Sequence, residues 1–238
     1  MMDILSSGAR RLGFAITRAQ LAQFQIYYEE LTAWNRRFNL TAITAYEDVQ
    51  IKHFLDSLTV ALASDIGRGR PRVLDIGSGA GLPGIPLKIL FPGIGLVLLE
   101  ATAKKTEFLQ HLKGRLGLDG VEIVTGRAEE VAHREPYREQ FDIVVARAVA
   151  PLPALAEMAL AFCAPGGRFV AQKKGDIAGE IERAGEAITV MGGALLEIKR
   201  VDLAEFTGTR QLVIIRKVNP SPPQYPRRPG MPVKKPLR

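Results

Sequence analysis

The chain of 238 residues has few of the side chains that build disulfides or metal cages, and no long apolar run. Cys163 is its only cysteine, which excludes an internal disulfide and a cysteine-based metal site. The three histidines, His53, His111 and His133, are dispersed, so we expect no metal site. Prolines and charged residues interrupt the longest apolar stretch, 143–165, which therefore excludes a membrane span.

The amino terminus also lacks the charged, apolar and small-residue order of a signal peptide. Hydrophobic residues make up 47% of the chain, as in an ordinary globular protein. The length suits one α/β domain with an appendage and is short for two full domains. We therefore expect a soluble, cytoplasmic protein.

Positive charge is concentrated at the carboxyl terminus. The formal net charge is +7, and the segment from residue 217 onward contributes six of these charges because it contains no acid. Its basic residues are Lys217, Arg227, Arg228, Lys234, Lys235 and Arg238. Seven prolines predict an extended arm that cannot form a helix and that binds a polyanion. A disordered, solubilising tail is the alternative.

A glycine-rich turn is the most informative motif, in the segment Val-Leu-Asp-Ile-Gly-Ser-Gly-Ala-Gly-Leu-Pro-Gly at 73–84. Residues 72–76 predict a buried strand, and the apolar spacing after Pro83 predicts a helix with this proline in its first turn. The glycines between them are Gly77, Gly79 and Gly81. Without a Cβ atom, glycine tolerates unusual φ angles and lets a ligand lie against the backbone.

An acid follows this turn at the spacing of one βαβ unit. Glu100 lies at the end of the next apolar run, 25 residues after Asp75, where ribose hydroxyls could donate to its carboxylate. The context predicts a nucleotide-type cofactor site. Leu82 stands where a dinucleotide fingerprint has its third glycine, which favours S-adenosylmethionine over NAD. The alternative is a tight turn followed by a solvated acid.

Strand and helix patterns alternate after residue 71. Strands are expected near 72–76, 95–99, 121–125, 141–146, 168–172, 195–201 and 211–217, with helices between the first six. The short connection 202–210 predicts an antiparallel hairpin for the last two strands. Apolar positions at helical spacing over 17–34, with Thr17 as N-cap, and over 46–63 predict a helical cap.

These elements predict an α/β fold of the Rossmann-like, class I S-adenosylmethionine-dependent methyltransferase type, with a seven-stranded, mainly parallel sheet. We divide the chain into an N-terminal helical cap at 1–68, a methyltransferase domain at 69–217, and a basic, proline-rich tail at 218–238.

Ligands of open α/β sheets bind beyond the carboxyl ends of the strands. The loop Gly-Arg-Ala-Glu at 126–129 could present Ala128 and Glu129 to an adenine, although an ordinary helix N-terminus has the same pattern. Arg147 follows a strand buried on both faces, so it either pairs with a neighbouring acid or faces the ligand.

The target is expected to be a ring nitrogen. The residues after Arg147 do not form the Asn/Asp-Pro-Pro-aromatic motif of many enzymes that methylate exocyclic amines. Cys163 lies in an apolar helix end, where we expect a buried, inert thiol rather than the nucleophile that carbon methylation requires. A ring nitrogen of guanine needs neither a covalent step nor a base, only alignment with the methyl group.

Scattered cations suggest a track for an RNA backbone, although each taken singly is more often a solvated residue. These residues, with one aromatic, are Arg36, Arg37, Lys173, Lys174, Tyr225, Arg227 and Arg228. Trp34 and Phe38 are interpreted as core residues rather than base-stacking ones.

Six distinctive segments span nearly the whole chain. They are Trp34-Asn-Arg-Arg-Phe-Asn-Leu-Thr-Ala-Ile-Thr44, Lys52-His-Phe-Leu-Asp-Ser-Leu58, Asp75-Ile-Gly-Ser-Gly-Ala-Gly-Leu-Pro-Gly-Ile-Pro86, Gly126-Arg-Ala-Glu129, Arg147-Ala-Val-Ala150 and Tyr225-Pro-Arg-Arg-Pro-Gly230. Together they resemble the glucose-inhibited division protein B, or RsmG, family of small-subunit rRNA methyltransferases. The resemblance implies S-adenosylmethionine-dependent methylation of guanine N7 in 16S rRNA, in a loop near the decoding centre.

The resemblance also implies site residues. With the residues of the glycine turn included, the expected cofactor contacts are Asp75, Gly77, Gly79, Gly81, Leu82, Glu100, Ala101, Thr102, Ala128, Glu129 and Arg147. Arg147 is further expected to shape the target site. The candidate RNA contacts are Arg36, Arg37, Asn39, Lys173, Arg200, Arg227 and Arg228. After Glu100, Ala101 replaces the serine more usual in the family.

The sequence thus predicts a monomeric rRNA guanine-N7 methyltransferase that binds the small ribosomal subunit. Two alternatives remain open at this point. The first is an NAD-linked oxidoreductase, and against it this chain lacks both the third glycine and a recognisable proton-transfer set. A non-catalytic RNA-binding module would not need the intact turn at 77–81 or Glu100.

Overall fold

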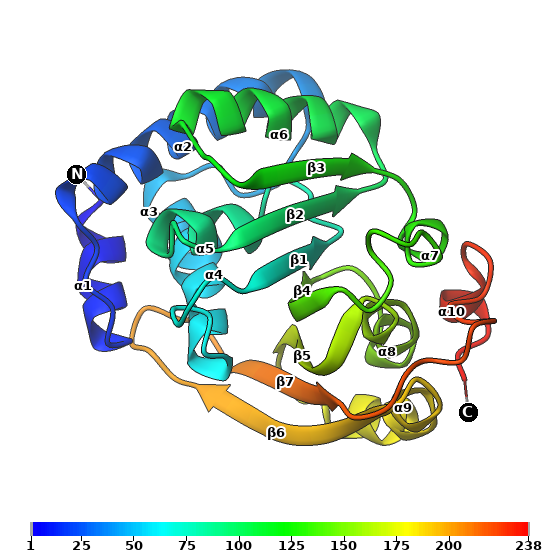
Figure 1. Ribbon diagram of the computed structural model, residues 1–238. Helices are drawn as coiled ribbons and strands as arrows, with labels where there is room; N and C mark the ends of the chain where they lie inside the picture. Colours follow the sequence, from blue (N-terminus) through cyan, green and yellow to red (C-terminus); the bar gives the residue numbers. More distant parts are fainter. Residues whose placement is uncertain (1, 238) are drawn as a thin grey trace.

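The computed structural model describes residues 2–237. In this part of the chain, seven strands form one sheet between two layers of helices (Figure 1). The strands are β1 (Arg72–Ile76), β2 (Gly95–Glu100), β3 (Val121–Thr125), β4 (Phe141–Arg147), β5 (Cys163–Lys174), β6 (Gly193–Val201) and β7 (Arg210–Lys217).

The strand order is β3-β2-β1-β4-β5-β7-β6. Strand β7 runs antiparallel to both β5 and β6, and the other neighbours are parallel. The predicted mainly parallel sheet and its terminal antiparallel hairpin are confirmed. Strand β5 begins earlier than expected, at Cys163, so this residue starts a strand and does not end a helix.

Neighbouring residues of a central strand point to opposite faces of the sheet and enter different cores. In β1, Val73 belongs to one hydrophobic cluster and Leu74 to the other. The helices of the first face include α1 (Asp3–Arg11), α2 (Arg18–Phe38), α5 (Gly84–Leu90) and α6 (Ala103–Leu116). The second face carries α7 (Ala128–Val131), α8 (Leu152–Leu160) and α9 (Ala178–Val190).

The N-terminal helices belong to the core of the first face. Thr17 caps α2 as predicted, in a capping box with Gln20. The second helical stretch is continuous but changes hydrogen-bond pattern, through α3 (Tyr46–Val49), the π-helix η1 (Gln50–Leu55), α4 (Asp56–Leu58) and the 3₁₀ helix η2 (Thr59–Ala63). Phe54 joins the two stretches, because its ring packs against Phe24 and Tyr27 at centroid distances of 5.0 and 4.9 Å. The proposed boundary after residue 68 stays a prediction.

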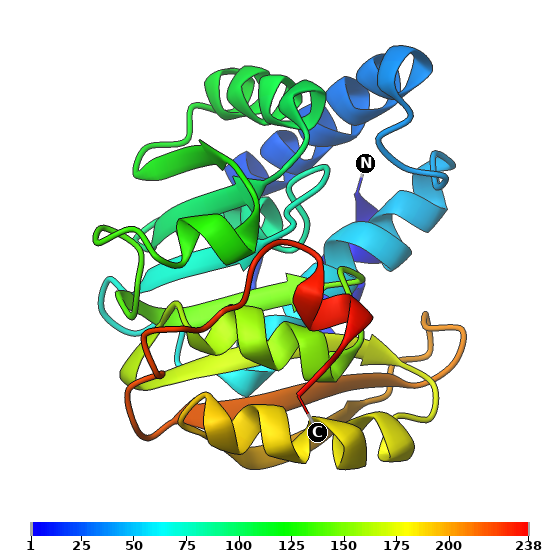
Figure 2. The ribbon, with the colours of Figure 1, turned by 90° about the vertical axis from the view of Figure 1, so that its right-hand side faces the viewer.

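The carboxyl-terminal segment is packed against the body of the protein, across the outside of α8 (Figure 2). The guanidinium of Arg138 donates to the carbonyls of Ser221, Pro222 and Tyr225, which fixes its course. The segment then forms the helix α10 (Met231–Lys234), with Pro232 in the first turn, where proline lacks no needed hydrogen bond. The prediction of an extended arm without a helix was therefore wrong.

Lys217, which the sequence assigned to the basic tail, lies at the end of β7 with no exposed surface. Its ammonium pairs with Glu139 at 3.0 Å and donates to the carbonyls of Leu160 and Met191. This lysine stabilises the fold and cannot contact a polyanion.

Among residues 2–237 there is no helix with the length and apolar character that crossing a membrane requires.

Candidate functional site

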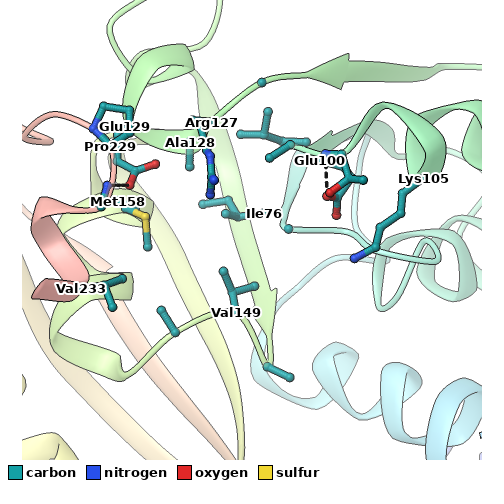
Figure 3. Close-up of a pocket in the computed structure, with 18 residues that line it drawn as sticks. Ile76, Glu100, Lys105, Arg127, Ala128, Glu129, Val149, Met158, Pro229 and Val233 are labelled. Atoms are coloured by element: carbon teal, nitrogen blue, oxygen red, sulfur yellow. Dashed lines mark hydrogen bonds between the residues drawn. The ribbon is translucent and has the colours of Figure 1, made fainter. Parts of the chain in front are cut away.

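A cavity of about 520 Å³, hereafter the first cavity, lies beyond the carboxyl ends of β1, β2 and β3 (Figure 3). Six predicted cofactor residues line it, from three different loops: Gly77, Glu100, Ala101, Thr102, Ala128 and Glu129. Figure 3 shows Glu100 and Glu129 on opposite sides of this cavity. The parallel strands bring these loops together because all of them end at the same edge.

Gly77 is a position that requires glycine. Its φ is +66°, and a Cβ atom would lie 2.7 Å from a methyl carbon of Val149. A larger residue would therefore strain the backbone and push into the lining of the first cavity. The backbone N–H of Gly77 donates to the carbonyl of Leu99, which ties the turn to β2.

Glu100 is held in place by backbone donors. One carboxylate oxygen accepts from the N–H of Gly79 and the other from the N–H of Thr102, each at 2.9 Å. The residue is buried, yet it lines the first cavity. Each carboxylate oxygen has two lone pairs, so both retain capacity to accept from ligand hydroxyls.

Four other predicted residues shape the turn and do not line the first cavity: Asp75, Gly79, Gly81 and Leu82. Asp75 is fully buried and accepts from the N–H of Gly84 at 2.8 Å, which fixes the start of α5. Burial, aided by the charge of Glu100, raises the pKa of Asp75 to about 7. The predicted helix begins at Gly84, directly after Pro83.

The carboxyl-terminal segment completes the first cavity, which the sequence did not predict. Pro229, Gly230 and Val233 line it, and the N–H of Gly230 donates to Glu129 at 2.8 Å. Nine further lining residues were not among the candidates: Ile76, Leu99, Lys105, Gly126, Arg127, Ala148, Val149, Ala150 and Met158. The motifs 126–129 and 225–230 contained Arg127, Pro229 and Gly230, but the second motif was assigned only to RNA.

Arg227 anchors this segment. Its guanidinium pairs with Glu157 at 2.6 Å, and its backbone N–H donates to the same carboxylate at 2.8 Å. Glu157 has no exposed surface, whereas a quarter of the Arg227 side chain is exposed. The hydrogen bond and charge of Glu157 raise the pKa of Arg227. This arginine, a candidate RNA contact, is thus committed to a buried ion pair.

Arg147 forms the ion pair that was one of its two expected roles. A guanidinium nitrogen lies 3.0 Å from a carboxylate oxygen of Asp56 and also donates to the carbonyl of Lys52. Arg147 does not line the first cavity but a neighbouring one. Its contact with the cofactor stays a prediction.

Cys163 is buried as expected, and burial raises the pKa of its thiol to about 12. A thiolate is the nucleophilic form, so this cysteine is unsuited to covalent catalysis.

The other candidate RNA contacts come from separate elements. Arg36, Arg37 and Asn39 are exposed at the end of α2, where Asn39 adopts the left-handed conformation with φ of 48°. Lys173 is mostly buried and pairs with Glu180 at 2.7 Å. Exposed Arg200 pairs with Asp202, and Arg228 is exposed.

Two solved structures share this architecture. The crystal structure of TrmN from Thermus thermophilus has a TM-score of 0.53 at 20% identity, covering 69% of this chain and 48% of that one. The crystal structure of precorrin-6y C5,15-methyltransferase from Geobacter metallireducens has a TM-score of 0.52 at 16% identity, covering 68% and 87%. The sheet order and the edge site thus define a class I methyltransferase fold.

Sequence similarity narrows this class to one family. A family model described as rRNA small subunit methyltransferase G matches residues 20–213. Proteins named ribosomal RNA small subunit methyltransferase G are 50% identical in Dehalococcoides mccartyi strain CBDB1, over 99% of this chain and all of the relative, and 45% identical in Pelotomaculum thermopropionicum, over all of this chain and 99% of the relative. The chain belongs to the rRNA small subunit methyltransferase G family, and the suspected resemblance is confirmed.

Proposed function

We propose that this protein transfers a methyl group from S-adenosylmethionine to N7 of a guanine in the 16S rRNA of the small ribosomal subunit. The observation that carries the proposal is the 50% identity, over 99% of the chain, to a relative named for methylation of small-subunit rRNA. The choice of a ring nitrogen draws support from the family resemblance and from Cys163, whose burial leaves the chain without a thiolate nucleophile.

The first cavity fits the proposed cofactor. Gly77 leaves the space that a side chain would fill, and the remaining lone pairs of Glu100 suit two ribose hydroxyls. Ala128 and Glu129 lie across the first cavity, where an adenine would be held. Ala101 stands where the family more usually has a serine, and this replacement does not affect the proposed contact between Glu100 and the ribose.

When bound, S-adenosylmethionine supplies a methyl group on a cationic sulfur. In transfer to guanine N7, the lone pair of N7 would form the new N–C bond as the S–C bond breaks, and the positive charge would pass to the purine. Because no proton leaves N7, the reaction needs no general base. The protein contributes by holding both reactants in line and by excluding water.

We also propose that the protein acts as a monomer in the cytoplasm, where small subunits are assembled. The exposed cations Arg36, Arg37, Arg200 and Arg228 are the proposed contacts to the RNA backbone.

The test is methyl transfer with binding. Purified protein is expected to bind S-adenosylmethionine in calorimetry, to prefer it to NAD, and to label the rRNA of unmodified small subunits with radioactive methyl. Preference for NAD would favour an oxidoreductase. Binding of RNA without label in it would favour a non-catalytic module.

A further inference from the structure

A second cavity of about 350 Å³ lies beside the first, at the carboxyl ends of β4 and β5. Ala148, which directly follows β4, lines both cavities. The volume falls within the range of small-molecule sites. A ligand in the second cavity would therefore lie next to a cofactor held in the first.

The wall of the second cavity is strongly cationic. Its basic residues are Lys52, Arg147, Lys173, Lys174 and Arg210, and its only acid is Asp56. Asp56 is 2% exposed and uses both oxygens for arginines, 3.0 Å from Arg147 and 2.7 Å from Arg210. The acid thus fixes two guanidinium groups in the wall. Lys52 and Lys173 pair with Asp48 and Glu180, at 2.8 and 2.7 Å, so the excess of positive charge that suits an anion comes from Lys174 and from one of the two arginines.

Lys174 is the cation best placed to receive that anion. It is exposed, and within residues 2–237 its ammonium makes no hydrogen bond or ion pair. Desolvation by the surrounding wall, together with the nearby cations Arg210, Arg147 and Lys52, lowers the pKa of this otherwise exposed side chain, although Asp56 opposes the shift. An anionic partner would relieve that repulsion.

Gln172 supplies a buried acceptor on the same wall. Its amide nitrogen donates to the carbonyl of Asp56 at 2.7 Å and to the hydroxyl of Thr59 at 3.1 Å. The carbonyl of Asp56 can only accept, so the amide cannot be turned around. The amide oxygen of Gln172 then has no partner, and the residue is only 8% exposed. Gln172 also lines the second cavity, so an N–H or O–H donor held there would satisfy this acceptor.

We infer that the second cavity holds the target guanosine 5′-phosphate unit of the RNA, with Lys174 at its phosphate and Gln172 accepting from its N–H donors. The apolar side chains of Ile43, Ala148 and Leu212 line the same cavity and suit the faces of a base. This inference rests on the proposed function and names the residues that select the nucleotide.

The chemistry of guanine matches this arrangement. Its N1–H and amino group donate from one edge, and N7 lies on the opposite edge of the purine. A base bound to Gln172 by its donor edge would therefore direct N7 away from Gln172, towards the rest of the site. Adenine offers only its 6-amino group beside an acceptor at N1, so it would place one donor and one repelling acceptor at Gln172 where guanine places two donors. Gln172 is thus a specificity-determining residue.

Nucleotide binding tests the cavity directly. The full chain, saturated with S-adenosylhomocysteine, is titrated with GMP or AMP in saturation-transfer NMR. We expect GMP to bind roughly tenfold more tightly than AMP, and Gln172→Met to remove most of this difference. Lys174→Ala should weaken both nucleotides, whereas Arg183→Ala, which removes an exposed cation on α9, should not. Equal binding of GMP and AMP to the unmodified protein would overturn the inference.

A second measurement does not depend on Gln172, whose replacement could disturb folding. Affinity for small subunits is measured against salt for Lys174→Ala and Arg183→Ala. Loss of one phosphate contact should lower the slope of log K against log salt by about 0.7 and leave S-adenosylhomocysteine affinity unchanged. Equal slopes for the two variants would overturn the phosphate assignment.

The two proposals fail separately. If the unmodified protein methylates guanine N7, but Lys174→Ala and Arg183→Ala have the same nucleotide affinity and salt dependence, the second-cavity site is refuted and the proposed function stands. Selective GMP binding without any methyl transfer to subunits would support the cavity and refute the function.

Discussion

Glu100 is an acid whose position is set before any ligand arrives. Two backbone N–H groups, from Gly79 and Thr102, donate to its carboxylate oxygens. Because the side chain is already fixed, binding of a ribose would cost it little conformational entropy. Its neighbour Gly77 keeps the adjoining space open. These residues explain why a short sequence motif was informative about the first cavity.

Glu100→Ala is expected to weaken S-adenosylmethionine binding roughly 30-fold, because a charged hydrogen-bond acceptor is lost. Calorimetry measures the affinity, and Glu107→Ala, which removes an exposed acid from α6, is the control. Equal affinity of the two variants would show that Glu100 does not contact the cofactor.

His53 predicts a pH dependence of folding. Burial, aided by Arg147, lowers the pKa of its imidazole from 6.5 to about 4. Above pH 6.5 the ring is neutral in both states, and its contribution is fully present. As the pH falls towards 4, only the unfolded chain takes up the proton, so stability is lost.

Between pH 7.5 and 4.5, the free energy of unfolding should fall by about 2 kcal/mol more for the unmodified protein than for His53→Gln. Asp75 acts with the opposite sign over the same range, because its raised pKa favours the fold at low pH. The contribution of Asp75 is the same in the unmodified protein and in His53→Gln, so it cancels when their free energies of unfolding are subtracted. Denaturation curves at each pH give the values, and parallel pH profiles would contradict the account. His133→Gln is the control, because His133 is an exposed residue, although one ring nitrogen lies 2.8 Å from the carbonyl oxygen of Pro226.

At the scale of elements, the carboxyl-terminal segment has a different role from the one its composition indicates. Arg227 and Gly230 attach it to Glu157 and Glu129, and Pro229 and Val233 form part of the first cavity. Removal of residues from 220 onward is therefore expected to weaken cofactor binding, and not RNA binding alone.

Arg227→Ala should lower the free energy of unfolding by about 3 kcal/mol, because it leaves the fully buried Glu157 without its charged partner. Arg228→Ala removes the adjacent, exposed cation and should change it by less than about 0.5 kcal/mol. Chemical denaturation compares the two. Similar values would mean that the ion pair does not hold the segment.

The sequence predicted elements whose signal is local. Period and capping located all seven strands and the start of α2 at Thr17, and the glycine spacing located the β1 turn. It did not predict contacts between distant segments. Arg147 pairs with Asp56, 91 residues away in the sequence, and Glu157 pairs with Arg227, 70 residues away. Only the folded structure brings these partners together. The positive charge of the tail suggested polyanion binding, but charge does not show which arginines are already paired.

For the whole molecule, one sheet edge brings two cavities together. The loops after β1, β2 and β3 form the first, the ends of β4 and β5 reach the second, and Ala148 lies in both. A cofactor in the first cavity and a nucleotide in the second would thus meet at the loop after β4. Methyl transfer between them would need neither a general base nor a covalent nucleophile. The reaction is therefore defined by the atom of the rRNA that receives the methyl group.

That atom is identified by methylating unmodified small subunits and treating the rRNA with borohydride and aniline, which cleave at N7-methylguanine. We predict one cleavage site that depends on the protein and on S-adenosylmethionine, and that becomes weaker with Glu100→Ala at limiting S-adenosylmethionine. Methyl incorporation without cleavage would place the group on another atom and contradict the account.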